Sequence, residues 1–150
     1  MVKQINVENA DIGFRNFEGR EGPYNKAGER SFAIFLEPDE AQFYSEQGWN
    51  VKFPKVRDFS DDEEDNRRPY MHVSVGFQYY PPKVIMISGE TPTQLTEEEV
   101  ALLDWAEILT ADLVIRPYVW SVNGKTGIKA YLKTAYITLQ TDAFASKYGL

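Results

Sequence analysis

Aromatic and cationic side chains alternate on either side of the dipeptide Asn123-Gly124. Asn-Gly favours a type I′ hairpin turn of about two residues, which would place Trp120 opposite Gly127. One face of the predicted hairpin then carries large aromatic rings and cations, namely Arg116, Tyr118, Trp120, Lys125, Lys129, Tyr131 and Lys133. Rings on such a face can stack on bases while cations contact phosphates, so the pattern favours binding of single-stranded nucleic acid.

The surroundings of this row favour exposure over burial. No Asp or Glu occurs between Leu113 and Thr141, although the chain is net acidic. Burying a row of lysines would be costly, and Gly127 would leave the Trp120 indole room to lie flat. The alternative is a second buried face, on which the rings pack beneath a helix while lysine stems reach past its edge. The opposite face is the predicted core face, with Ile115, Pro117, Val119, Ile128, Ala130 and Leu132.

Two further segments could extend the predicted binding surface. Residues 70–80 alternate strictly, which predicts a half-buried strand with Met71, Val73, Val75, Phe77 and Tyr79 pointing inward. The polar face of this strand adds Tyr70, His72 and Tyr80. A Gly-rich loop at residues 18–28 and its flanks add Arg15, Phe17, Lys26 and Arg30. The alternatives are a strand-surface role for His72 and a mobile hairpin tip with scattered charge for the loop.

Composition excludes several classes of chemistry. The chain has 150 residues and a formal charge of −7, which argues against coating duplex DNA by bulk positive charge. It has no Cys and one His, which excludes zinc–thiolate sites and thiol nucleophiles. It has no P-loop, GxGxxG, GxSxG or HExxH motif. We therefore expect a protein that is not an enzyme and holds no metal or cofactor.

Two acidic segments have simple structural interpretations. Residues 58–65 contain six acids, but a contiguous run lacks the spacing that converges carboxylates on one ion. They predict a mobile acidic loop at about 58–68 that is not a metal site. Thr96–Glu99 form a capping box, and capping with the helix dipole alone explains Glu97–Glu99. The helix is expected to run to about Glu107.

The remaining pattern predicts many short strands and few helices. Strands are expected at residues 5–17, 31–36, 49–53, 70–80 and 83–88 and between 113 and 139, with Trp49 in the core. A helix should begin at Pro38 and stop at Gly48. The predicted fold is mainly β: an OB-like five-stranded β-barrel with one or two short α-helices and a long C-terminal β-hairpin. Residues 1–150 are expected to form a single OB-like nucleic-acid-binding domain.

Several stretches also carry a family resemblance through their order and spacing. They are Phe14–Phe17 with the Gly-rich loop Gly22–Arg30, Ser31–Leu36, Gly48–Lys52, Leu103–Trp105 and Ile115–Leu132, within about residues 12–136. In these stretches the chain resembles phage-encoded single-stranded DNA-binding proteins with an OB fold. The resemblance implies a non-enzymatic protein that coats single strands during phage DNA replication or recombination, with replication or recombination proteins as partners. Many such proteins end in an acidic tail, whereas residues 142–150 contain one acid, so recruitment through a tail is not predicted.

Two other functions compete with DNA binding. A phage protein-interaction or assembly module could use the aromatic face as an interface, but interfaces are depleted in Lys, so the lysine row favours nucleic acid. A metal-dependent nuclease would need spaced acids near the basic face, and the sequence has none there. The N-terminus has no apolar run and no segment approaches about 20 apolar residues, so a soluble protein in the host bacterial cytoplasm is expected, with no membrane. The oligomeric state stays open.

Overall fold

The structure, a computed structural model, describes residues 2–23, 25–54 and 68–140. The described chain is mainly β, as predicted, with nine strands in one mixed sheet. The strands are β1 (Ile5–Val7), β2 (Asp11–Asn16), β3 (Arg30–Phe35), β4 (Val51–Lys52), β5 (Tyr70–Val75), β6 (Lys83–Ser88), β7 (Thr91–Gln94), β8 (Ile108–Val122) and β9 (Lys125–Leu139). The helices are α1 (Pro38–Glu46) and the 3-10 helix η1 (Glu99–Asp104).

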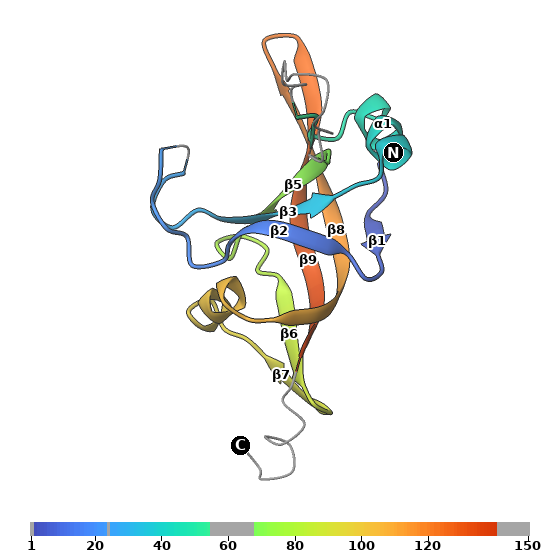
Figure 1. The fold of residues 1–150 in the computed structure, drawn as a ribbon. Helices are drawn as coiled ribbons and strands as arrows, with labels where there is room; N and C mark the ends of the chain where they lie inside the picture. Colours follow the sequence, from blue (N-terminus) through green and yellow to red (C-terminus); the bar gives the residue numbers. More distant parts are fainter. Residues whose placement is uncertain (1, 24, 55–67, 141–150) are drawn as a thin grey trace, which may run out of the picture.

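Strand β9 is the centre of the sheet. The main path runs β1-β8-β9-β5-β3-β2, while β4 pairs with β5, and β6 pairs with β9 and β7. β9 is antiparallel to β8 but parallel to both β5 and β6. Figure 1 shows the β8–β9 hairpin projecting from one end of the sheet and the β6–β7 hairpin from the other. The predicted long C-terminal hairpin is therefore confirmed.

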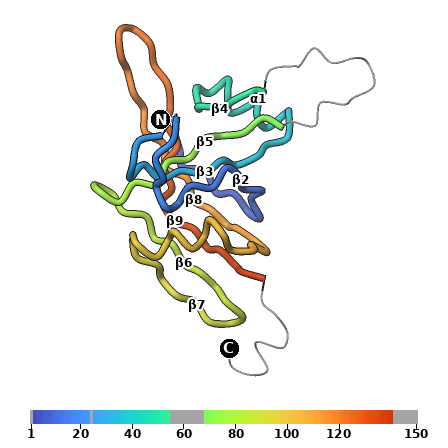
Figure 2. Tube along the Cα trace, turned by 60° about the vertical axis from the view of Figure 1, so that its left-hand side comes forward, coloured from blue at the N-terminus to red at the C-terminus, as the bar shows by residue number. Residues whose placement is uncertain are grey.

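The predicted barrel is confirmed only as this mainly β sheet. Within the described residues no ladder joins β2 to β8, and β8 pairs instead with β1. Just before β2, the Ala10 N–H donates a hydrogen bond to the Ala111 carbonyl of β8 at 2.7 Å. Figure 2 shows the strands curving around one another between the two projecting hairpins. Closure into a five-stranded barrel stays a prediction.

The single strand predicted at residues 5–17 is two strands. Asn9 adopts a left-handed conformation with φ 47°, which turns the chain between β1 and β2. The helix at Pro38 is confirmed, and Gly48 with φ 100° follows it, as expected for a C-terminal glycine. Only Val51–Lys52 of the predicted strand at 49–53 is in the sheet. Trp49 is buried and bridges to Ile128, which confirms its core position.

The capping box at Thr96 is confirmed, but the helix after it is shorter than predicted. The Thr96 N–H donates to the Glu99 carboxylate at 2.9 Å, and Leu95 and Val100 are both buried. The segment forms a 3-10 helix that ends at Asp104 instead of an α-helix to Glu107. The reason is tertiary, because the Arg15 guanidinium donates to the Leu103 and Ala106 carbonyls at 2.7 and 2.9 Å. These side-chain bonds replace the bonds of further helical turns.

The strand predicted at residues 70–80 ends at Val75. Met71, Val73 and Val75 are buried, as the alternation predicted. Beyond Val75 the neighbouring strands do not continue, since β3 begins at Arg30 opposite Val75 and the parallel pairing to β9 ends at Ser74. Residues 76–80 therefore leave the sheet, and Tyr79, predicted to point inward, is 80% exposed.

Candidate nucleic-acid interface

The turn at Asn123-Gly124 forms as predicted, with φ 51° and 78°. Strands β8 and β9 then pair Trp120 with Gly127, Tyr118 with Lys129 and Arg116 with Tyr131, in the predicted register. These pairs place aromatic and cationic side chains on one face of the hairpin. Because β9 is also parallel to β5, this face continues onto the exposed side of β5.

The predicted register fails next to Lys133. Val114 pairs with Thr134 instead of Lys133, because a β-bulge lies between Val114 and Ile115. The Lys133 ammonium donates to the Gln4 side chain at 3.1 Å. Lys133 was predicted to be a binding residue, but it is not among the residues that line the groove described next.

A groove of about 560 Å³ lies where the base of the hairpin meets β5 and the β2–β3 loop. Predicted binding residues that line it are His72, Tyr80, Arg30, Arg116, Tyr118, Lys129 and Tyr131. We call it the hairpin groove. Residues that the sequence analysis did not select also line it, including Ser74, Gln78 and Glu97. The tertiary structure thus brings half of the predicted residues together, from segments far apart in the sequence.

Arg116 is held between aromatic rings in this groove. Its guanidinium carbon lies 5.0 Å from the Tyr80 ring centroid and 5.0 Å from the Tyr131 ring centroid. The Lys129 ammonium lies 5.0 Å from the same Tyr131 ring, and Tyr118 meets Tyr131 edge to face at 6.1 Å. Cation–π contacts orient the cations without neutralising them. Within the described residues neither cation has a carboxylate partner, so both keep their charge for an anion.

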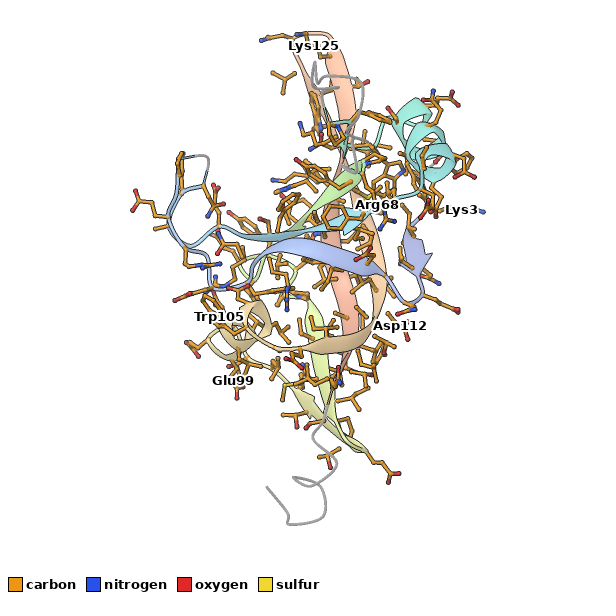
Figure 3. All side chains as sticks on the ribbon, viewed as in Figure 1. Lys3, Arg68, Glu99, Trp105, Asp112 and Lys125 are labelled. Carbon is orange, nitrogen blue, oxygen red and sulfur yellow. The ribbon has the colours of Figure 1, made fainter. Side chains whose placement is uncertain are left out.

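Trp120 and Lys125 lie beyond the groove, toward the hairpin tip. A Cβ atom at Gly127 would stand 2.5 Å from the Trp120 ring, so the indole lies directly over the glycine, as predicted. The ring is 37% exposed, which leaves its outer side open for stacking. Lys125 stands at the tip, where Figure 3 labels it. These two residues share the predicted face but do not line the hairpin groove.

The opposite face of the hairpin tip is not a core face. Val119, which was predicted to face the core, is 60% exposed. Ile115, Ile128, Ala130 and Leu132, nearer the sheet, are buried as predicted. The prediction for Val119 is wrong because the tip projects past the elements that cover the base of the hairpin (Figure 1).

His72 lies on the groove floor, between cations. Burial lowers its pKa first, and the positive charges of Lys129 and Lys52 lower it further, while Glu29 opposes them. The imidazole is therefore neutral near pH 7 and can donate or accept a hydrogen bond. His72 lies on the half-exposed face of β5, as the alternating pattern predicted, and that face lines the groove.

Arg30 lines the groove but is already paired. Its guanidinium donates to the Glu97 carboxylate at 3.1 Å and lies 5.8 Å from the Phe77 ring centroid. The Nε atom of Arg30 is buried and makes no hydrogen bond. Glu97 thus does more than support the helix dipole, which is all that the sequence analysis assigned to it. It places a carboxylate on the groove wall next to a cation.

Three predicted binding residues do not line the hairpin groove. Phe17 is 1% exposed and stacks on Phe32 in the core at 5.3 Å, so its ring is inaccessible. Arg15 holds the carbonyls at the end of η1. Lys26 is exposed on the β2–β3 loop and lies outside the hairpin groove. The prediction for Phe17 is wrong because a residue near a loop was assumed to share the exposure of the loop, whereas Arg15 stays a prediction.

Tyr70 belongs to a second groove at the other end of β5, with a volume of about 750 Å³. Its ring contacts Phe14 at 5.2 Å and Phe35 at 6.2 Å, and Lys52, Phe53 and Arg68 also line this groove. We call it the Phe14 groove. The sequence analysis selected Tyr70 alone. An available signal was Gly13 before Phe14, because a glycine in a strand marks a bulge or a close approach.

Three further predictions concern metal binding, the acidic loop and membranes. Among residues 2–23, 25–54 and 68–140, no cluster of three or more His, Asp or Glu could hold a metal ion. The acidic loop predicted at about 58–68 falls almost wholly within residues 55–67, outside the described residues. No helix in the described chain is long and apolar enough to cross a membrane.

The sheet surface and its grooves define a class of protein. Exposed rings beside unneutralised cations are typical of a binder of single-stranded nucleic acid. A family model described as a putative phage ssDNA-binding domain matches residues 1–150, and the chain belongs to this family. Membership confirms both the resemblance and the prediction of a non-catalytic protein. A search of curated proteins finds no match.

Solved structures agree on the fold. The chain is similar to the single-stranded DNA-binding protein from bacteriophage Enc34 in complex with ssDNA, with 16% identity and a TM-score of 0.57 over 94% of this chain and 89% of that chain. Another structure of the Enc34 protein gives 15% identity and a TM-score of 0.55 over 98% and 90%. Its C-terminal truncation gives 14% and 0.55 over 93% and 87%.

Proposed function

We propose that this protein coats single-stranded DNA, with the hairpin groove as the main contact surface. The observation that carries the proposal is Arg116 between Tyr80 and Tyr131, with Lys129 against the same ring. Bases would stack on the exposed rings at about 1–3 kcal/mol per base, and the two cations would contact phosphates. The contacts are sequence-tolerant, because every base has a flat face.

The groove favours single strands over duplexes. Bases in a duplex are already stacked and their flat faces are hidden, so the rings of the groove could not use them. A duplex would have to bind through phosphate contacts alone, and the formal charge of −7 opposes this. The rings therefore supply the preference, while the local cations supply part of the affinity.

The setting that fits this activity is phage DNA replication or recombination in the cytoplasm of a bacterial host. The parallel pairing of β5 with β9 and the long β8–β9 hairpin support an OB-like barrel as the scaffold. Replication or recombination proteins are candidate partners, and the described residues do not identify a surface for them.

The second candidate is a protein-interaction or assembly module that uses the same aromatic face. Exposed Tyr118, Tyr80 and Trp120 would suit an interface, since Tyr and Trp are enriched there. Lys129 on the groove and Lys125 at the tip weigh against it, because Lys is depleted at interfaces.

The test is a titration of a fluorescent oligonucleotide, single-stranded and then annealed, at two salt concentrations. We expect tight salt-dependent binding to the single strand and weak binding to the duplex. Lys129→Ala should weaken binding and make the log–log salt slope shallower by about 0.7 for each phosphate that the variant no longer neutralises. Lys3→Ala, on an exposed residue remote from the groove, is the matched control. Equal affinity for both forms, or an unchanged slope in Lys129→Ala, would contradict the proposal.

A further inference from the structure

We propose that the Phe14 groove is a second base-stacking subsite, so that one DNA strand runs along β5 from the hairpin groove to Phe14. The inference rests on the proposed single-strand binding and adds to it a second contact surface. Its ligand is a base of a strand already bound in the hairpin groove. Four observations carry it: the backbone at Phe14, the arrangement of its rings, the charges beside them, and the continuity of the surface.

The backbone at Phe14 is strained in a way that presents its ring to solvent. Phe14 has φ 46°, a left-handed conformation that bulky residues seldom adopt. A β-bulge in the pairing of β2 with β3 accompanies it, between Gly13 and Asn16. The side chain is 67% exposed as a result. Such strain costs about 1–3 kcal/mol and concentrates at functional sites, which here is a ring turned onto the surface of the sheet.

The rings of this groove are supported from below. A Cβ atom at Gly13 would overlap the Phe35 ring, so Phe35 lies directly over a glycine, as Trp120 does over Gly127. Phe14 leans on Phe35 at 5.5 Å with an interplanar angle of 60° and on Tyr70 at 66°. Phe35 and Tyr70 thus pack against the Phe14 ring in tilted and edge-to-face orientations, and the exposed side of that ring remains available to stack on a base.

Charge in the Phe14 groove suits a phosphate backbone. Lys52 and Arg68 both line it. Arg68 is engaged by the carboxylates of Asp11 and Glu37, so it has little charge to offer. Lys52 is exposed, and it lies close enough to His72 to lower the pKa of that imidazole together with Lys129. Positive charge therefore extends from the hairpin groove across His72 to the Phe14 groove.

The two grooves share one strand face. Tyr70, His72 and Ser74 alternate along β5, with Tyr70 in the Phe14 groove and the other two in the hairpin groove. Tyr70 and Ser74 stand four strand steps apart, which is about 13 Å; at about 3.4 Å per nucleotide this span alone takes about four nucleotides, in addition to those that occupy the two grooves. An oligonucleotide of about four nucleotides can fill one groove, whereas one of about ten can reach both.

The experiment measures the affinity of thymidine oligonucleotides of about four and about ten nucleotides by fluorescence anisotropy. Phe14→Asn removes the ring, and Asn tolerates the left-handed conformation, so the bulge should persist. We expect about 5- to 150-fold weaker binding of the longer oligonucleotide and no change for the shorter one. Lys52→Gln should make the salt slope shallower for the longer oligonucleotide alone.

Two other variants keep the outcomes distinct. Phe43→Asn removes a ring of comparable exposure, 56%, from α1, outside both grooves, and should leave both affinities unchanged. Tyr131→Ala, in the hairpin groove, should weaken binding of both lengths. If Phe14→Asn and Lys52→Gln bind the longer oligonucleotide like the parent while Tyr131→Ala fails, the second subsite is wrong and the first stands. If Tyr131→Ala changes neither affinity, the proposed function itself is wrong.

Discussion

The base and the tip of the β8–β9 hairpin have the same alternating pattern of residues but different surroundings. At the base, Ile115 and Leu132 are buried at 0% and 2% exposure, and the other face lines the hairpin groove. At the tip, Val119 is 60% exposed and Trp120, on the other face, is 37% exposed. Alternation decides which side of a strand a residue occupies, whereas burial depends on whether another element covers that side.

This difference separates two ways of contacting DNA. The base presents a concave surface in which Arg116 and Tyr131 are fixed by their neighbours. The tip presents a single ring on a projecting arm, with Lys125 at its end (Figure 3). A fixed group loses less conformational entropy on binding, so we expect the base to supply more affinity per ring than the tip.

The largest expected effect is on the free energy of unfolding, and it should separate the face of the hairpin base that is predicted to be core from the same face at the tip. Leu132→Ala should lower the free energy of unfolding by about 2–5 kcal/mol, because it opens a cavity in the buried base. Val119→Ala should change it by at most about 0.5 kcal/mol, since an exposed side chain at the tip fills no core volume. Urea unfolding followed by circular dichroism measures both. A comparable decrease in the two variants would mean that something covers the tip in solution.

The next largest effect is on single-strand affinity, and it should separate the binding face at the base of the hairpin from that at the tip. Tyr131→Ala should weaken single-strand binding by about 1–3 kcal/mol, and Trp120→Ala should lie at the lower end of that range. Both should leave the free energy of unfolding nearly unchanged, because neither ring fills the core. Oligonucleotide titration with a parallel urea melt gives both quantities. A larger decrease in affinity for Trp120→Ala would reverse the ranking of base and tip.

A smaller effect should come from the carboxylate on the groove wall. Glu97→Gln should tighten single-strand binding by about 2- to 5-fold, since it removes a negative charge and frees Arg30 from a partly exposed ion pair worth about 1 kcal/mol. The matched control is Glu98→Gln, an exposed neighbour that does not line the groove. Titration at low salt should resolve the difference. Equal tightening in both variants would mean that the loss of one negative charge, and not the release of Arg30, causes the effect.

The smallest effect concerns pH at the base of the hairpin. The pKa of His72 is lowered in the folded protein by burial and then by Lys129 and Lys52. Its contribution to stability is therefore complete above the unfolded pKa of about 6.5 and declines as pH falls through the lower folded value. Phosphates bound beside Lys129 would favour the protonated imidazole. The affinity for single strands should therefore rise as the pH falls through the folded pKa of His72.

His72→Gln is the test of this pH dependence. Urea melts and titrations at about pH 7 and about pH 5.5 should show a smaller change in the variant than in the parent protein. Since the imidazole lies in the base of the hairpin, Trp120→Ala at the tip should keep the parent's pH dependence. An identical pH profile in His72→Gln and the parent would contradict this role.

Much of the local structure was predictable because its determinants are close in sequence. Asn123-Gly124 sets the turn and thereby the register as far as Arg116 and Tyr131. Thr96 and Glu99 satisfy each other's backbone groups as their spacing requires. The inward row of β5 follows from strict alternation. In each case the interacting groups are separated by few residues or by one turn.

The errors occurred where a distant partner decides the outcome. Arg15 is three residues from the predicted Gly-rich loop, yet it binds the end of the helix η1, 88 residues further along the chain. Phe17 lies in the core because Phe32 packs on it and the Asp104 carboxylate accepts its backbone N–H at 2.7 Å. The bulge at Lys133 depends on the whole β8–β9 ladder. None of these partners is visible in the local pattern.

The sequence by itself determined the chemistry of this protein, which is that of aromatic rings and cations on a hairpin whose register is set by its turn. The tertiary structure alone decided which of them meet. Parallel pairing of β5 with β9 brings His72 beside Lys129, and the left-handed backbone at Phe14 turns a ring onto the same face. The physical reason is that residue type and period fix local geometry, whereas coverage and long-range pairing depend on how the entire sheet packs.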